Sequence, residues 1–197
     1  KEHPNEPVRI TVGTTIDTLE RELAKYLLKY GHLDFVVVED KDEYTFNVAR
    51  YIFDELDADG LQLREGVYRN IVELYRTEWV SRGDGVEVPT HPFVNHADHA
   101  VSSVSIDLLT SDDSYVISKI WEQKDVHIES VEEQLSEGVP KVVILFKWRM
   151  LEGRMAELKK LIDVGDDEDE AFAANLALYT KYQAARVAIA KTVGRLI

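Results

Sequence analysis

The sequence predicts an all-α protein: a helical bundle, then a connector, then a C-terminal antiparallel helical hairpin. Apolar residues recur along most of the chain with the 3.6-residue period of a helix that buries one face. Serine, threonine or aspartate precedes many of these segments and glycine follows them, as at the beginnings and ends of helices. We therefore expect a linker remnant at 1–13, a bundle at 14–125, an acidic connector at 126–140 and the hairpin at 141–197.

The predicted bundle consists of helices that begin at a capping residue and end at a glycine or a loop. A β-branched run, Phe35–Val38, could be a lone strand. It has no second strand pattern nearby to pair with, so we expect an extended connector or a helical turn there. Gly138 and Pro140 are expected to separate an acidic helix at 130–136 from the hairpin. The expected bundle helices run from Thr14 or Thr15 to Gly31, from Thr45 to Gly60, from Val67 to Gly83, from Asp98 to Leu108, and from Asp113 or Ser114 to Trp121.

The hairpin is predicted from an apolar seam on its first helix. Members of the seam are three or four residues apart, so they share one helix face. Gly165 is expected to end this helix in a left-handed conformation, and Asp167 with Glu170 forms the capping pattern that starts the next helix. Because the connection is short, the two helices must be antiparallel neighbours. The seam consists of Ile144, Trp148, Leu151, Met155, Leu158 and Ile162.

The second helix of the hairpin carries the candidate partner-binding residues. Its predicted packing stripe is made mostly of small residues: Ala171, Ala174, Leu178, Tyr182, Ala185, Ile189, Val193 and Leu196. Such a stripe leaves larger side chains beyond the reach of one partner helix, and tyrosine and arginine dominate interface hot spots. The alternative is that the tyrosines pack against Trp148 and Leu151 inside the hairpin. The candidate docking residues are Tyr179, Tyr182, Arg186, Ile189 and Val193.

Composition and charge restrict the possible partners. Asp and Glu outnumber Lys and Arg by 37 to 23, for a formal charge of −14, so tight nucleic-acid binding is not expected. The chain has no cysteine, no apolar run approaching the roughly 18 residues of a membrane span, and a polar N-terminus unlike a signal peptide. We therefore expect a cytoplasmic protein without membrane contact. A possible basic contact face, or else a solvated helix face, consists of Lys147, Arg149, Arg154, Lys159 and Lys160, beside Lys141.

The residues predict neither a catalytic nor a metal site in this chain. The segment HPFVNHADHA holds His91, His96, Asp98 and His99, which could ligate zinc or iron, but its spacing suits loop structure and helix starts better. No histidine has a glutamate three residues before it, as a di-iron bundle requires. The carboxylates of Asp54, Glu55, Asp57 and Asp59 are expected to form a solvated helix face. We accordingly expect no cofactor and no enzymatic activity.

Several segments together resemble the C-terminal region of bacterial replicative DNA primases, the DnaG family. The resemblance begins with ERELAKYLLKYGH, VARYIFDEL and GLQLREGVYRNIVELYR and continues through FVNHADHAVSSVSIDLLTSDDSYVISKIW. KWRMLEGRMAELKKL and LALYTKYQAARVAIAKTVG are similar to the terminal helical hairpin of that region. Together these segments cover nearly the whole chain after about residue 15. The matching positions in the longest segment are Phe93, Asn95, His96, Asp98, Leu108, Leu109, Tyr115, Ser118 and Trp121.

The resemblance implies a helicase-binding domain cut from a primase. In that family the hairpin docks on the N-terminal collar of the hexameric DnaB-type helicase and brings primer synthesis to the replication fork. Some members also contact the acidic tail of single-stranded DNA-binding protein, which here would require the basic face around residues 147–160. Zinc and magnesium are implied only for the parent's zinc-binding and polymerase domains. Another helical adaptor, such as a helicase loader, and a metal-dependent helical enzyme are the competing hypotheses.

Overall fold

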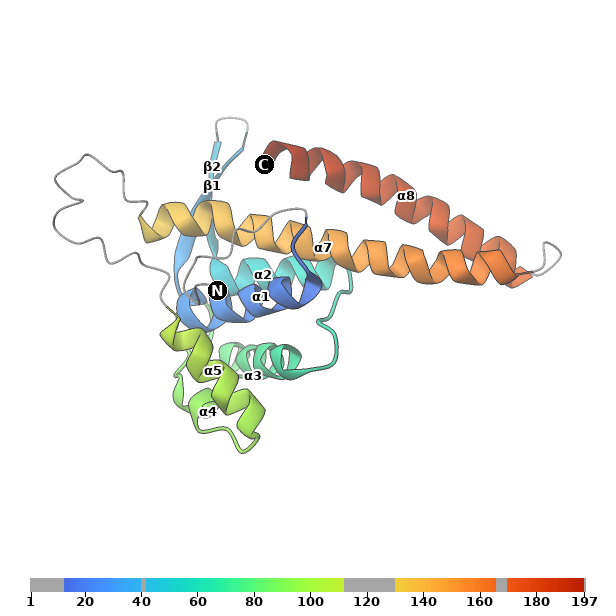
Figure 1. The fold of residues 1–197 in the computed structure, drawn as a ribbon. Helices are drawn as coiled ribbons and strands as arrows, with labels where there is room; N and C mark the ends of the chain where they lie inside the picture. Colours follow the sequence, from blue (N-terminus) through green and yellow to red (C-terminus); the bar gives the residue numbers. More distant parts are fainter. Residues whose placement is uncertain (1–12, 40–41, 112–129, 166–169, 197) are drawn as a thin grey trace, which may run out of the picture.

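The computed structural model describes residues 13–39, 42–111, 130–165 and 170–196, and it is mostly helical with one two-stranded sheet (Figure 1). The predicted class is therefore correct in its helical character but omits the sheet. The predicted helix from Asp113 or Ser114 to Trp121 lies outside the described residues. The elements are α1 (Ile16–Tyr30), β1 (Asp34–Glu39), β2 (Asp42–Asn47), α2 (Val48–Ala58), α3 (Val67–Arg82), α4 (His91–Val94), α5 (His99–Thr110), α7 (Val131–Val164) and α8 (Glu170–Leu196).

Several predicted helix ends are confirmed by their capping geometry. The Thr15 side chain accepts a hydrogen bond from the backbone N–H of Thr18 at 3.3 Å, and the Asp98 side chain accepts one from Ala100 at 2.8 Å. Each bond satisfies an N–H group that has no partner within its helix. Gly60 follows α2 with φ of +57°, a conformation that an L side chain rarely adopts. Local sequence therefore determines where these helices begin or end.

The prediction for residues 35–47 is wrong, because the chain forms a β-hairpin there. β1 pairs antiparallel with β2 from Asp34 opposite Asn47 to Glu39 opposite Asp42. The cap of α2 is accordingly Asn47, whose side chain accepts from the N–H of Arg50 at 3.2 Å, and not Thr45. The segment DEYTFN does not predict a strand by itself, because it is acidic and only weakly buried. The buried Phe35 ring meets Tyr51 of α2 edge-on at 5.4 Å and anchors the hairpin to the bundle.

The predicted break at Gly138 and Pro140 is also wrong. α7 runs without interruption through both residues, and Ser130 begins it with a complete capping box to Glu133. Proline inside a helix removes one backbone hydrogen bond and costs about 3 kcal/mol. Val139, Val142 and Val143 around it are buried against the bundle, and this packing offsets the loss. Residues 130–140, assigned to a connector, thus form the first turns of the longest described helix.

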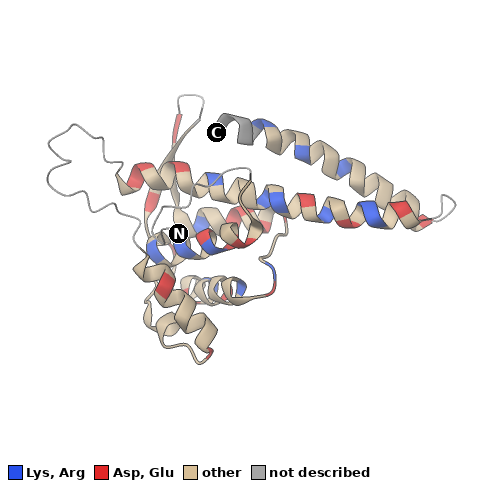
Figure 2. Ribbon diagram, viewed as in Figure 1, with Lys and Arg blue, Asp and Glu red and all other residues tan. Residues whose placement is uncertain are grey.

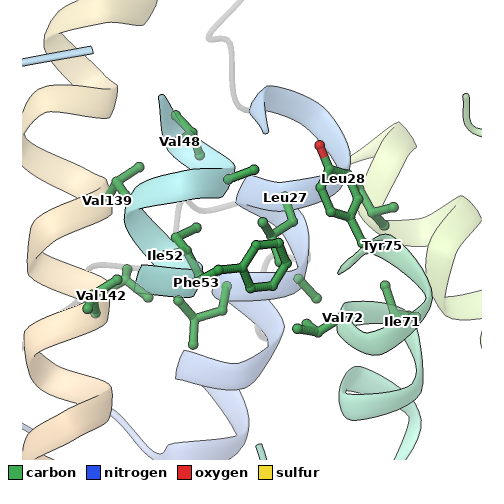
Figure 3. Packing of buried hydrophobic residues seen from close by; sticks show 14 of the residues in the cluster. Leu27, Leu28, Val48, Ile52, Phe53, Ile71, Val72, Tyr75, Val139 and Val142 are labelled. Carbon is green, nitrogen blue, oxygen red and sulfur yellow. The ribbon is translucent and has the colours of Figure 1, made fainter. Parts of the chain in front are cut away.

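α1 lies at the centre of the fold and contacts α2, α3, α5 and α7. Leu19, Leu23 and Leu27 on α1 are buried. Phe53 of α2 and Tyr75 of α3 extend toward α1 from the neighbouring helices, while Val139 and Val142 of α7 close the other side (Figure 3). Burial of an aromatic or branched side chain stabilises by about 1.5–3 kcal/mol, so this cluster holds the N-terminal half of α7 to the bundle.

One buried polar atom predicts a stabilising substitution. Ser105 on α5 is fully buried, and its Oγ has no hydrogen-bond partner among the described residues. An unpaired buried hydroxyl is destabilising because it has lost its bond to water. Ser105→Ala should therefore raise the free energy of unfolding by about 1 kcal/mol, as measured by urea denaturation. The exposed neighbour Ser103→Ala is the control and should change little; loss of stability in Ser105→Ala would contradict the assignment.

Candidate docking surface

α7 joins the bundle to a projecting hairpin. Its N-terminal half packs in the core through Val142, Leu145 and Phe146. The C-terminal part of the helix continues away from the bundle, and α8 returns antiparallel beside it (Figure 1). In the described structure α8 packs mainly on α7, and the far end of the hairpin projects beyond the bundle (Figure 1). A pair of helices held out in this way can lie in a groove of another protein.

The packing face of α8 includes Tyr182 and Ile189 of the predicted stripe, but in the first turns it differs from that stripe by about one residue. Phe172, Asn175, Tyr179, Tyr182 and Ile189 are half-buried, at the three- and four-residue steps of a helix–helix seam. Ala171, Ala174, Leu178 and Ala185, assigned to the stripe, are exposed. Burying an aromatic ring removes more apolar area from water than burying an alanine, so the larger side chains occupy the seam.

The five candidate docking residues lie in different environments. Tyr179 and Tyr182 belong to the half-buried seam, and the Gln183 amide donates to the Tyr179 hydroxyl at 3.2 Å. Ile189 packs at the margin of the bundle core. The exposed Arg186 places its guanidinium 5.7 Å from the ring centroid of Trp148 on α7, a cation–π contact. The backbone of Val193 lies in α8, but its side chain is outside the described residues.

The connection between the helices does not use the predicted left-handed glycine. Gly165 has φ of −76° and ψ of 158°, an extended conformation open to any residue. A Cβ at this position would lie 2.9 Å from the Phe172 ring of α8, so lack of space, and not the backbone angle, favours glycine here. The predicted cap, Asp167, lies outside the described residues.

Exposed apolar side chains gather at the far end of the hairpin. Leu161 and Val164, in the last turns of α7, are 53% and 83% exposed, and Leu176 of α8 is also exposed. We call these three residues the hairpin tip. Val187 lies eleven residues after Leu176, about three turns, so it extends the same side of α8 and is 57% exposed. Large apolar side chains exposed on a projecting element make that element a candidate interaction surface.

α8 has a charge opposite to that of the whole chain. From Ala171 to Leu196 it has four cationic residues and no acidic one, in a chain of formal charge −14. Figure 2 shows blue positions along α8, whereas α7 and the bundle have both blue and red positions. The cations are Lys181, Arg186, Lys191 and Arg195. The hairpin therefore presents a cationic helix beside an apolar tip.

The predicted basic contact face divides into two parts. Lys147 binds the carboxylates of Glu55 at 2.6 Å and Asp59 at 2.7 Å, and Arg149 donates to the Thr14 carbonyl oxygen and to Glu152. These two cations hold α7 to the bundle. Asp57 similarly binds Arg76. The side chains of Glu55, Asp57 and Asp59 are at least 40% exposed, as predicted for a solvated face, but each also takes part in an ion pair. Arg154, Lys159 and Lys160 lie on the projecting half of α7.

Lys147 is charged under ordinary conditions and serves as an ion-pair partner. Burial acts to lower the pKa of its ammonium group, but hydrogen bonds from that group to Asp59 and Glu55 outweigh this effect and raise the pKa overall. Lys147→Met removes the cation from two carboxylates and should lower the free energy of unfolding by about 1–2 kcal/mol. The exposed Lys159→Met is the control, and equal melting temperatures for both variants would contradict a structural role.

The histidine-rich segment performs structural tasks at the start of α5. The backbone N–H of Asp98 donates to Nδ1 of His96 at 3.0 Å, and Asp98 caps the helix. No group of three or more His, Asp or Glu side chains suited to a metal occurs within the described residues. A hollow between α2 and α3 is lined by Arg69 and Arg76, and each arginine is paired with a carboxylate.

No helix within the described part of the chain is both long and apolar enough to cross a membrane.

Comparison with curated proteins gives no match, and comparison with solved structures gives none either. A family model matches residues 6–196, nearly the full length. The chain therefore belongs to the family described as a domain of unknown function, DUF8430.

Proposed function

We propose that this chain is the helicase-docking domain of a bacterial replicative DNA primase, and that its hairpin binds the N-terminal collar of a DnaB-type hexamer. The observation that carries the proposal is the hairpin tip, with three exposed apolar residues at the end of two helices that project from a bundle. Docking of such a tip would bring primer synthesis to the replication fork in the cytoplasm. Weak individual contacts become effective when several copies occupy one hexamer.

The resemblance to primases supports the proposal at the level of segments. FVNHADHAVSSVSIDLL covers α4 and α5, and the two similar C-terminal segments cover the projecting parts of α7 and α8. The architecture that the resemblance implies, a bundle followed by a helical hairpin, is compatible with the described elements. Tyr182 then supports the docking surface from within the seam, and the exposed Arg186 supports it through its contact with Trp148. The hairpin tip and the outer side of α8 make the contact.

The direct test is binding of the pure chain to the N-terminal domain of the replicative helicase, by isothermal titration calorimetry. The proposal predicts saturable binding, and absence of binding to both that domain and the whole hexamer would refute it. Binding to another replication protein instead would favour the alternative of a different helical adaptor or a helicase loader. The acidic tail of single-stranded DNA-binding protein is a second proposed partner, for which Arg154, Lys159 and Lys160 remain on the projecting half of α7.

The proposal assigns recruitment, and no catalysis, to this chain. Primer synthesis would belong to the polymerase and zinc-binding domains of a primase, with their magnesium and zinc. Template-dependent incorporation of ribonucleotides by the pure chain should therefore stay at background, and clear incorporation would overturn this assignment.

A further inference from the structure

The β-hairpin has an exposed edge, and the strand register shows which backbone N–H and C=O groups point outward there. The backbone N–H of Val48 donates to the Leu33 carbonyl oxygen at 2.9 Å, one step beyond the pair of Asp34 and Asn47. In antiparallel strands, pairs that exchange hydrogen bonds alternate with pairs that do not. Phe46 and Tyr44 of β2 therefore bond inward to β1. Glu43 and Thr45, between them, direct their N–H and C=O groups away from β1.

The edge that these groups form is accessible. β1 lies between β2 and α7, which it contacts, whereas β2 contacts β1 and the start of α2. Every residue of β2 from Asp42 to Phe46 is exposed. Within the described residues β2 pairs with β1 alone, and a strand edge of this kind can accept one further strand, whose main chain supplies the hydrogen bonds.

Side chains at this edge are suited to an extended partner with alternating chemistry. Tyr44 and Phe46 share one face of the hairpin because they are two residues apart, and Tyr44 is 47% exposed. Apolar side chains at alternate positions of an added strand could pack on them. The hairpin is also strongly acidic, with five acidic residues and one lysine between positions 34 and 43.

Charge decides between two occupants of the edge. A second copy of this chain would bring two acidic hairpins, on molecules of formal charge −14, against each other. An extended peptide with lysine or arginine between apolar residues would instead meet carboxylates such as Glu43 and Asp42. We propose that the β2 edge binds a basic, extended peptide segment of a partner protein by strand addition. The site lies beside the N-terminal half of α7, away from the hairpin tip, and it does not depend on the proposed helicase docking (Figure 1).

Thr45→Pro tests the proposal in the intact chain. The N–H of Thr45 points away from β1, so proline removes an edge donor and places its ring on the edge while the ladder inside the hairpin keeps its bonds. The probe is a synthetic ten-residue peptide that alternates lysine and valine, with an alternating glutamate and valine peptide for comparison. We expect the lysine peptide to shift the amide NMR signals of Glu43 and Thr45, and Thr45→Pro to weaken its binding at least tenfold.

The matched control is Val38→Pro. Val38 is paired with Glu43, so its N–H also points out of the hairpin, but at the edge of β1, and its side chain is 67% exposed. The Val38→Pro protein should bind the lysine peptide like the parent. Equal losses of peptide affinity in both variants, no amide shift at β2, or equal binding of the glutamate peptide would each overturn the proposal. Dimers in sedimentation that Thr45→Pro dissolves would also overturn it, in favour of a second copy.

Discussion

Gly31→Ala is expected to lower the free energy of unfolding by about 2 kcal/mol or more, because the space beside this glycine is filled. Gly31 has φ of −57° and so needs no special backbone freedom. A Cβ there would lie 2.6 Å from the Leu27 carbonyl oxygen and 2.7 Å from Cζ of Tyr75, and it would overlap the Tyr75 hydroxyl. Real Cβ atoms essentially never approach so closely. Tyr75 is buried in the core and cannot move aside without disturbing α3.

The control for this prediction is Gly153→Ala on the projecting half of α7. A Cβ at Gly153 meets nothing within 4 Å, and alanine favours the helix by about 1 kcal/mol over glycine. The two substitutions should therefore change urea midpoints in opposite directions. A Gly31→Ala protein as stable as the parent would show that Tyr75 is not held against this turn. Burial together with the charge of Glu87 raises the pKa of Tyr75 to about 12, so its hydroxyl is neutral at ordinary pH.

The sequence predicts the structure correctly where that structure depends only on neighbouring residues. Thr15 and Asp98 cap their helices as predicted, since a cap bonds to the next turn of its own helix. Gly31 shows the limit of that reasoning. The helix ends beside it as predicted, but glycine is required by a tyrosine 44 positions later in the sequence. Contacts between distant segments leave no local pattern.

The two errors in the fold have the same origin. The local pattern predicts a connector or helical turn at β1 because the partner strand alternates only weakly, but pairing with β2 and the contact of Phe35 with Tyr51 stabilise a strand. Pro140 predicts a break because proline opposes helix locally, but burial of the valines around it on the bundle outweighs that preference. In both cases contacts with other segments, which the local pattern does not show, determined the structure.

The candidate docking surface could be predicted as an element but not as a set of residues. The apolar periodicity predicts a second hairpin helix. It does not determine which face of that helix packs, because a face through Ala174 and Leu178 and a face through Asn175 and Tyr179 differ by a rotation of only one residue. Alanine is tolerated on either side of such a helix, so its pattern gives little information on orientation. The predicted roles of Tyr182 and Arg186 in docking stay predictions. Because both residues contact α7, a test must separate their structural role in the hairpin from a role in docking.

Leu176→Glu is expected to weaken binding to the helicase N-terminal domain about thirtyfold, or about 2 kcal/mol, without loss of stability. The substitution places a charge within the proposed apolar contact and reduces the positive charge of α8. Leu176 is exposed, so a glutamate at this position stays in water and does not disturb the seam. Calorimetry should therefore show weaker binding by a protein whose melting temperature equals that of the parent. Leu161→Gln on α7 should act in the same direction.

The matched control for the hairpin tip is Val80→Glu, the same kind of change at an exposed apolar residue of α3, far from the tip. It should bind like the parent. Tyr182→Ala and Arg186→Ala serve as the contrasting pair, because they loosen the seam or remove the contact with Trp148. They should lower the melting temperature of the hairpin as they weaken binding. If Leu176→Glu and Leu161→Gln fold and bind like the parent while Arg186→Ala folds but does not bind, the contact lies along Arg186 and the hairpin tip is not the docking surface.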